Sequence, residues 1–351
     1  MSPLPSATAP EPSGAGSPAE STASAAALPE IPVVDTGPDF PWETLVREEE
    51  RVHALLDVAT ARIPERALRA LDSVSRSWIA GREADDLAEV DRIAVRLGRP
   101  GAYFLSINYE WGCTVRVCPA PDGESARLIR VLDWRTPGLG ANIIAARVAG
   151  PSGPFVTMTW PGYTGVLQAV AEGRFAAALN QAPMRRPLGL YPFDWAVNAA
   201  RVWRSPHPAA ARVLRVVFET AGTFAEAKRM LTERPIASPG IFALAGVGPS
   251  ELAIIERTET EARVHDGDQV AANHWQAAGW QGSARGPDSA RRSCEMARVP
   301  ADLSPDFSWL VPPLRNARTR LGMQADAATG GLVALGYEAE GPATRPLQLS
   351  L

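Results

Sequence analysis

Residues 101–114 read Gly-Ala-Tyr-Phe-Leu-Ser-Ile-Asn-Tyr-Glu-Trp-Gly-Cys-Thr, which places Cys113 directly after a glycine. A short apolar run, Ala102–Ile107, leads into this stretch, and a strand-like sequence begins at the cysteine. Breakage of the Gly112–Cys113 bond would make Cys113 an amino terminus. Its α-amino group, with a reference pKa of about 7.7–8.0, could then act as the base for its own thiol. Cys113 is therefore the candidate nucleophile, and Gly112–Cys113 is the candidate cleavage site.

A basic and an acidic residue follow on the next predicted strand, at Arg130 and Asp133. The arginine could hold a thiolate and the aspartate an α-ammonium. Side chains three residues apart face opposite sides of a plain strand, so we expect a strand end or a bulge to bring both to the cysteine. The alternatives are a buried structural cysteine at position 113 and two solvated surface charges.

The stretch around Cys113 resembles the segment that leads into the autoprocessing cysteine of acid ceramidase and N-acylethanolamine acid amidase. These are N-terminal-nucleophile cysteine hydrolases of the choloylglycine hydrolase type. Further stretches resemble the same family in the same order; they lie at 161–167, 174–181, 223–232, 271–275 and 290–293. The similarity covers roughly residues 40–300. It implies a four-layer αββα sandwich in which Cys113 opens a central strand.

The resemblance also assigns roles to particular residues. Where the family has Arg-Asn-x-Asp, this chain has Arg130-Val131-Leu132-Asp133, so both charged residues are kept and Val131 replaces the asparagine. Asn273 matches a catalytic asparagine, and its amide N–H2 is a suitable donor to an oxyanion. The alternative for Asn273 is a residue that caps a turn.

The remaining site candidates come from the later matching stretches. Arg291 matches the first arginine of a family pair that supports the cysteine and the asparagine, and Arg292 takes this role if the register differs by one residue. Tyr163, Asn180 and His274 are predicted to contribute to the substrate pocket, although an aromatic ring or an amide at a strand end also serves structural roles.

The sequence divides into three parts. Residues 1–35 are mostly Ala, Pro, Ser and Gly, a composition typical of disordered segments. Residues 36–112 place apolar residues at helical spacing and are predicted to form a helical segment that stays attached after cleavage. Residues 113–351 are predicted to form the catalytic domain, with the segment after Pro312 covering the sheets. An order of strands, then helices, then strands indicates an α+β fold.

The individual elements follow from hydrophobic periodicity and turn residues. Helices are predicted at 41–63, 64–79, 83–97, 192–203, 208–220, 223–232 and 289–299. Strands are predicted at 102–107, 113–118, 126–132, 142–148, 155–160, 174–179, 241–247, 252–257, 261–265 and 269–273. Thr223 and Glu226 form a predicted capping box at a helix start.

Composition excludes several classes of protein. The formal net charge is −4 and no basic block is present, which argues against nucleic-acid binding. The three cysteines are too few for a disulfide framework and have no second Cys/His pair for a metal site, so neither a metal nor an organic cofactor is expected. No apolar run is long enough to span a membrane. The first residues lack the pattern of a signal peptide, which predicts a cytoplasmic protein.

These observations predict an amidase that hydrolyses the linear C–N bond of an N-acyl amine or related acyl amide. Its partners are a small acyl amide substrate and its own N-terminal fragment. An acyltransferase resembling isopenicillin N acyltransferase is the alternative with the same catalytic residues. A binding protein that keeps the fold without cleaving itself is the alternative outside enzymes.

Overall fold

The computed structural model of the protein describes residues 28–81, 84–106 and 111–351. The strands of one sheet are β1 Val33–Gly37, β4 Ile144–Gly150, β5 Gly153–Thr159, β6 Gln168–Ala171, β7 Phe175–Gln181, β8 Gly240–Ala245, β9 Leu252–Arg257 and β10 Ala262–Asp266. Those of the second are β2 Trp111–Pro119, β3 Ala126–Trp134, β11 Gln269–Ala271, β12 Thr319–Asp326, β13 Gly331–Glu338, β14 Gly341–Pro342 and β15 Leu347–Leu349.

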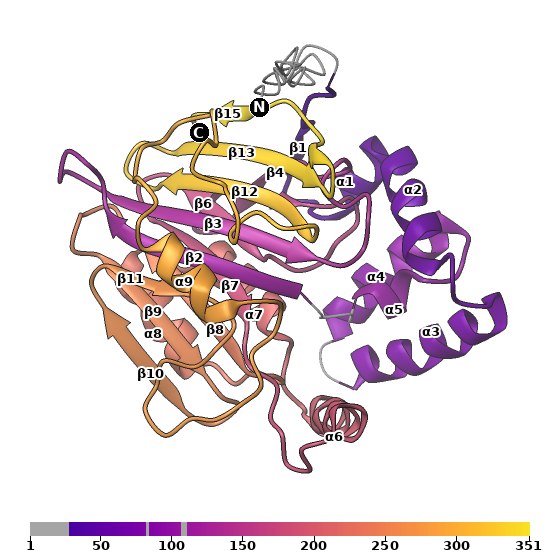
Figure 1. Cartoon of the computed structure of the whole chain (residues 1–351). Coiled ribbons are helices and arrows are strands. Elements are labelled where there is room, and N and C mark those ends of the chain that lie inside the picture. Colours follow the sequence, from indigo (N-terminus) through magenta and orange to yellow (C-terminus); the bar gives the residue numbers. More distant parts are fainter. Residues whose placement is uncertain (1–27, 82–83, 107–110) are drawn as a thin grey trace, which may run out of the picture.

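The two sheets pack face to face (Figure 1). The first has the strand order β1-β4-β5-β6-β7-β8-β9-β10. The second has the order β11-β2-β3-β12-β13-β14, with β15 beside β13. Most of their strands are apolar and buried on both faces, as expected for strands enclosed by a second sheet on one side and by helices on the other.

Helices cover the outer face of each sheet. Helices α7 (Ala210–Thr220) and α8 (Phe224–Glu233) pack on the first sheet, and α9 (Ser289–Met296) packs on β2 of the second. The Thr223 hydroxyl accepts a hydrogen bond from the Glu226 backbone N–H at 3.2 Å, which confirms one half of the predicted capping box at α8. The Glu226 carboxylate accepts from the Gly222 N–H at 2.8 Å. The layers are therefore helix, sheet, sheet and helix, and the predicted α+β sandwich is confirmed.

The pairing of β2 with β3 positions the candidate nucleophile. The strands run antiparallel, with Cys113 opposite Leu132 and Gly112 opposite Asp133. Because side chains alternate along a strand, Cys113 and Leu132 face the core between the sheets, whereas Val131 faces the core beneath α9. The strand begins at Trp111, two residues before Cys113, so in the intact chain the cysteine does not open the strand as predicted.

The N-terminal part lies beside the sandwich and is tied to it by a strand. Its helices are α1 Trp42–Arg47, α2 Glu49–Thr60, α3 Glu65–Ala80, α4 Ala84–Leu97 and α5 Ala102–Ser106. Strand β1 pairs in parallel with β4 of the first sheet. A further helix, α6 (Tyr191–Arg204), lies next to this part at one end of the molecule (Figure 1).

Three further sequence predictions are wrong, and one strand was missed. Residues 102–106 form helix α5 instead of a strand, and residue 107 lies outside the described residues. Residues 33–35 belong to β1 rather than to a disordered tail, whose first 27 residues also lie outside the described part. The segment after Pro312 contributes strands to the second sheet instead of covering it. Strand β6 was not predicted.

Candidate active site

The Cys113 thiol is buried between the two sheets beside a buried arginine. Arg130 Nη2 donates to Cys113 Sγ at 3.1 Å and to the Leu179 carbonyl at 2.8 Å, and Arg130 Nη1 donates to Asn180 Oδ1 at 3.0 Å. Burial raises the pKa of the Cys113 thiol to about 11, against the opposing effect of Arg130. The thiol of the intact chain is therefore protonated at neutral pH.

The backbone nitrogen of Cys113 has its own partner. It donates to Asn273 Oδ1 at 2.7 Å, and Arg292 Nη2 donates to the same oxygen at 3.0 Å. Two donors on one atom identify it as the amide oxygen, so the Asn273 amide nitrogen faces the other way, where it donates to the Gln181 carbonyl at 2.8 Å. Asn273 thus holds the nitrogen that cleavage would convert into the α-amino group.

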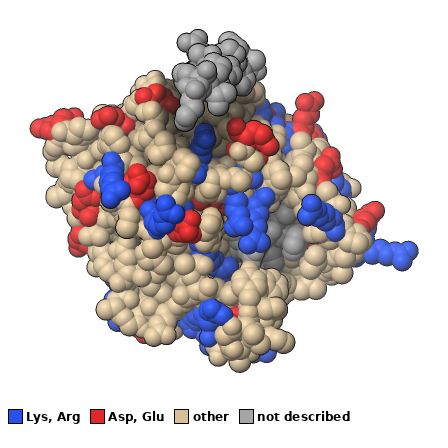
Figure 2. Space-filling model, in the orientation of Figure 1, with Lys and Arg blue, Asp and Glu red and all other residues tan. Residues whose placement is uncertain are grey.

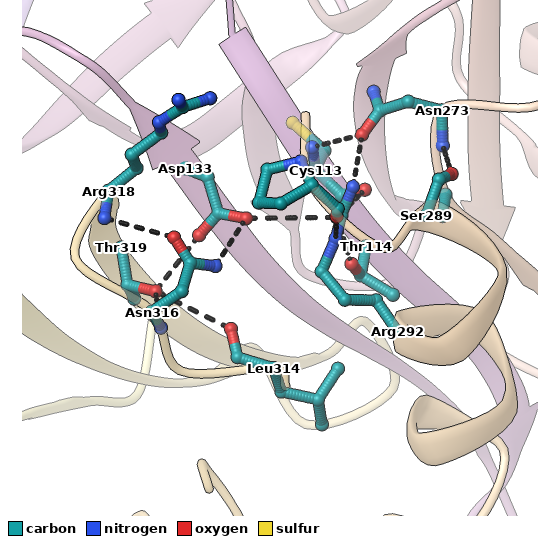
Figure 3. A network of polar contacts seen from close by, with 12 residues as sticks. Cys113, Thr114, Asp133, Asn273, Ser289, Arg292, Leu314, Asn316, Arg318 and Thr319 are labelled. Atoms are coloured by element: carbon teal, nitrogen blue, oxygen red, sulfur yellow. Dashed lines mark hydrogen bonds and ion pairs between the residues drawn. The ribbon is translucent and has the colours of Figure 1, made fainter. Parts of the chain in front are cut away.

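Arg292 lies on the face of β2 opposite to the Cys113 thiol (Figure 3). Its Nη1 donates to the Cys113 carbonyl at 2.7 Å and to Thr114 Oγ1 at 2.6 Å, and lies 3.7 Å from Asp133 Oδ2. The guanidinium is fully buried, so its contacts satisfy a charge that burial alone would make costly. One residue along α9, Arg291 is exposed. The structure therefore places Arg292, not Arg291, in the site.

Asp133 is the buried carboxylate of the site. Thr319 Oγ1 donates to Asp133 Oδ1 at 2.9 Å, and Asn316 Nδ2 donates to Asp133 Oδ2 at 3.1 Å. Burial raises the pKa of this carboxyl group, while Arg292, Asn316 and Thr319 oppose the rise. A Cβ placed on Gly112 would lie 3.7 Å from Asp133 Oδ2, so the carboxylate stands next to the candidate cleavage site.

Arg130 and Asp133 reach the cysteine without a bulge in the β2–β3 pairing. Arg130 shares the inward face with the thiol, and Asp133 shares the outward face with Arg292 and with the space beside Gly112. The bulge is therefore unnecessary, and Asp133 lies one residue before the end of β3, as the other predicted alternative has it. One face of β3 places Arg130 beside the Cys113 sulfur, and the other face places Asp133 beside the Gly112–Cys113 peptide bond.

Two pockets meet at this site. The first, of about 340 Å³, is lined by Gly112 and Asp133 together with Arg135, Arg285 and Arg318. The second, of about 260 Å³, is more apolar and includes residues of α3 and α6. The lining residues that both pockets share are Trp111, Gln181 and Arg285. The two pockets are therefore neighbours, and Gly112 lines the first of them.

The three residues predicted to line the substrate pocket lie in different places. Asn180 lines the second pocket and holds Arg130. Tyr163 instead lies in a separate hollow between α2 and the sandwich, with its ring packed against Trp160. His274 is half-buried and bonded to Ser289 Oγ at 2.8 Å, and it lines neither pocket.

Sequence reasoning missed several residues that support the site. Gln181 accepts from the Trp111 N–H through its side chain and from Asn273 through its carbonyl. Ser289 Oγ accepts from the Asn273 N–H at 2.9 Å. Asn316 and Thr319 hold Asp133 from the segment that was expected only to cover the sheets. No sequence signal marked them, because their role depends on the pairing of β12 with β3.

Comparison with known proteins finds similarity among solved structures. No protein-family model matches the chain, and no curated protein sequence matches it. Among solved structures, the chain is similar to a Caenorhabditis elegans N-acylethanolamine-hydrolyzing acid amidase ortholog, with 20% identity and a TM-score of 0.48 over 68% of this chain and 100% of that chain.

The chain is also similar to conjugated bile acid hydrolase from Clostridium perfringens, in the structures of two of its single-residue variants. One gives 11% identity and a TM-score of 0.39, and the other gives 11% identity and a TM-score of 0.37. Each alignment covers 68% of this chain and 92% of the other.

Two features are absent from the described residues. They contain no cluster of His, Cys, Asp and Glu that could hold a metal ion. Within the same ranges, none of the helices is long and apolar enough to cross a membrane.

Proposed function

We propose that the chain is an N-terminal-nucleophile cysteine amidase that first cleaves its own Gly112–Cys113 bond. The observation that carries the proposal is the separate support of the two reacting atoms of one residue. Arg130 contacts the sulfur of Cys113 at 3.1 Å, and Asn273 binds its nitrogen at 2.7 Å. A structural cysteine in a sheet needs no arginine at its sulfur, and its backbone N–H is ordinarily paired with a neighbouring strand rather than with a side chain.

Self-cleavage starts with attack of the Cys113 sulfur on the Gly112 carbonyl carbon. The C–N bond breaks, the thiol proton passes to the nitrogen, and a thioester joins Gly112 to the sulfur. Water then hydrolyses the thioester, which leaves a carboxylate on Gly112 and a free thiol and α-amine on Cys113. Asp133 stands beside Gly112 and is the group suited to hold the new α-ammonium.

Hydrolysis of an acyl amide repeats this chemistry on a bound substrate. The α-amino group takes the thiol proton, and the sulfur attacks the amide carbon. The amine then leaves with that proton, and water releases the acid from the thioester. Arg130 stabilises the thiolate. A hydrogen of the Asn273 amide that is not used by Gln181 is the proposed donor to the oxyanion.

Acyl transfer to a second amine would use the same residues, so the acyltransferase of the isopenicillin N type stays as the alternative enzyme. A binding protein on this fold has no use for a buried Arg130–Asn180 pair directed at a thiol, and no observation favours it.

The test is the fate of the chain when single cysteines are removed. All three cysteines are free: Cys113 and Cys118 are buried, and Cys294 is exposed. Purified wild-type protein should give fragments 1–112 and 113–351 by intact mass. The Cys113→Ala variant should stay whole and hydrolyse no acyl amide, whereas Cys118→Ala and Cys294→Ala should cleave and hydrolyse normally. A fully active, uncut wild-type chain would refute the proposal.

A further inference from the structure

The pocket beside Gly112 is lined by arginines that come from one end of the second sheet. Arg135 directly follows β3, and Arg318 directly precedes β12. The Trp134 N–H donates to the Arg318 carbonyl at 2.7 Å, so the two arginines are held side by side by backbone pairing. Arg285 joins them in the lining. Figure 2 shows basic side chains gathered in the middle of this face of the molecule.

Among the residues that the structure describes, no acidic side chain pairs with two of these arginines. Over the ranges that the structure describes, no hydrogen bond or ion pair reaches the guanidinium group of Arg135 or of Arg318. The Arg318 backbone N–H donates to Asn316 Oδ1 at 2.9 Å, while its guanidinium points away from that contact (Figure 3). Asp133, the acidic side chain among the described lining residues, is buried and bonded to Asn316 and Thr319. The pocket therefore presents positive charge to its contents.

The chemistry of the site decides which half of the substrate meets this charge. The α-amino group forms where the Cys113 nitrogen now lies, beside Gly112, and it must deliver a proton to the leaving amine. The amine half therefore lies on the side of Gly112, in the arginine-lined pocket. The acyl half lies on the side of Asn180 and Leu179, which line the apolar pocket.

We propose that the amine half of the substrate carries a carboxylate that Arg135 and Arg318 bind, so the substrate class is an N-acyl amino acid. This inference rests on the proposed amidase function. A guanidinium binds a carboxylate through paired, charge-assisted hydrogen bonds, whereas a neutral amine half would leave both arginines without a partner. The site therefore selects the acyl amide by the charge on the group that departs.

The test compares matched substrates, N-lauroylglycine and its neutral amide, N-lauroylglycinamide. Wild-type protein should give a kcat/KM at least about tenfold higher for the acid. Added salt should reduce this ratio because it screens exposed charges. The ratio should fall to near one in the double variant Arg135→Gln, Arg318→Gln. Arg229→Gln removes one positive charge from the exposed face of α8 and should leave the ratio unchanged.

A binding measurement separates failure of this inference from failure of the amidase proposal. The pocket is present in the intact chain, so calorimetry can be done with uncleaved Cys113→Ala protein. N-lauroylglycine should bind this protein more tightly than its neutral amide, and the added Arg135→Gln and Arg318→Gln changes should remove the difference. If the acid binds more tightly in this way but no amide is hydrolysed, the carboxylate-binding site is supported and the amidase proposal is rejected. Equal hydrolysis of both compounds, or equal binding in the absence of hydrolysis, would overturn the inference.

Discussion

At the scale of single residues, the two adjacent arginines of α9 show how finely the site depends on register. A helix turns about 100° per residue, so neighbours on α9 point to different surroundings. Arg292 is fully buried against Cys113, Thr114 and Asn273, whereas Arg291 is exposed. The sequence pointed to the pair but could not decide between its members, because that choice depends on how α9 packs on β2.

This difference gives a matched pair of variants. Arg292→Lys keeps the positive charge near Asp133 but loses most of the forked hydrogen bonds. We expect slower self-cleavage and a kcat lowered by about tenfold or more, since each lost charge-assisted bond costs roughly 1.5–3 kcal/mol. Arg291→Lys should match wild type in both measurements. Intact mass over time and steady-state kinetics test this, and equal loss in both variants would contradict the assignment.

The raised pKa of Cys113 predicts the pH dependence of self-cleavage. Burial raises the pKa of the thiol to about 11, so the neutral form is favoured in the folded intact chain. The neutral thiol contributes fully to the free energy of unfolding below the ordinary cysteine pKa of about 8.5. This contribution is lost as the pH rises towards about 11, the pKa of the thiol in the folded chain. The thiolate fraction therefore rises about tenfold per pH unit through pH 9.

The rate of cleavage should follow the thiolate fraction. Unprocessed chain refolded from denaturant at pH 6 to 9, quenched with acid and measured by intact mass, should cleave faster at each higher pH without a plateau. A plateau near pH 8 would show that the thiol already has an ordinary or lowered pKa before cleavage.

At the scale of elements, the sequence predicted most helices and strands but failed where short apolar runs were ambiguous. Ala102–Ile107 has the length and composition of a buried strand, yet residues 102–106 form α5. Periodicity cannot separate the two for so short a run. Strand β13 is apolar and buried on both faces, so it shows no alternation, whereas β12 alternates apolar and polar residues from Leu321 to Asp326 and was missed all the same. Their absence from the prediction also hid Thr319 and its contact with Asp133.

Strand β1 is the element that should keep the two fragments together after cleavage. It belongs to fragment 1–112 and pairs with β4 of fragment 113–351. Val34 is 3% exposed, and Val33, on the other face of the strand, is 42% exposed. Val34→Asp would bury an unpaired charge, which costs several kcal/mol. We expect processed Val34→Asp protein to lose its N-terminal fragment on size exclusion. Val33→Asp protein should retain it, and retention in both would contradict this role of β1.

At the scale of the whole molecule, the apolar pocket forms where three parts of the chain meet. Leu71 comes from α3 of the N-terminal part, Trp195 and Trp203 come from α6, and Leu179 comes from the first sheet. The N-terminal part therefore lines the pocket that we propose for the acyl group. Its retention after cleavage is expected to matter for activity.

The size and lining of this pocket predict how activity depends on the acyl chain. Each methylene moved from water into an apolar site contributes about 0.8 kcal/mol, or roughly a fourfold gain in kcat/KM. Activity on N-acylglycines should therefore rise steeply from acetyl upward and level off once the pocket of about 260 Å³ is filled. Leu71→Trp narrows the pocket from the N-terminal side and should move the plateau to shorter chains. The exposed Val74 of the same helix, changed to Trp, is the control. If activity is independent of chain length in both wild type and Leu71→Trp, the acyl group does not bind between the N-terminal part and the sandwich.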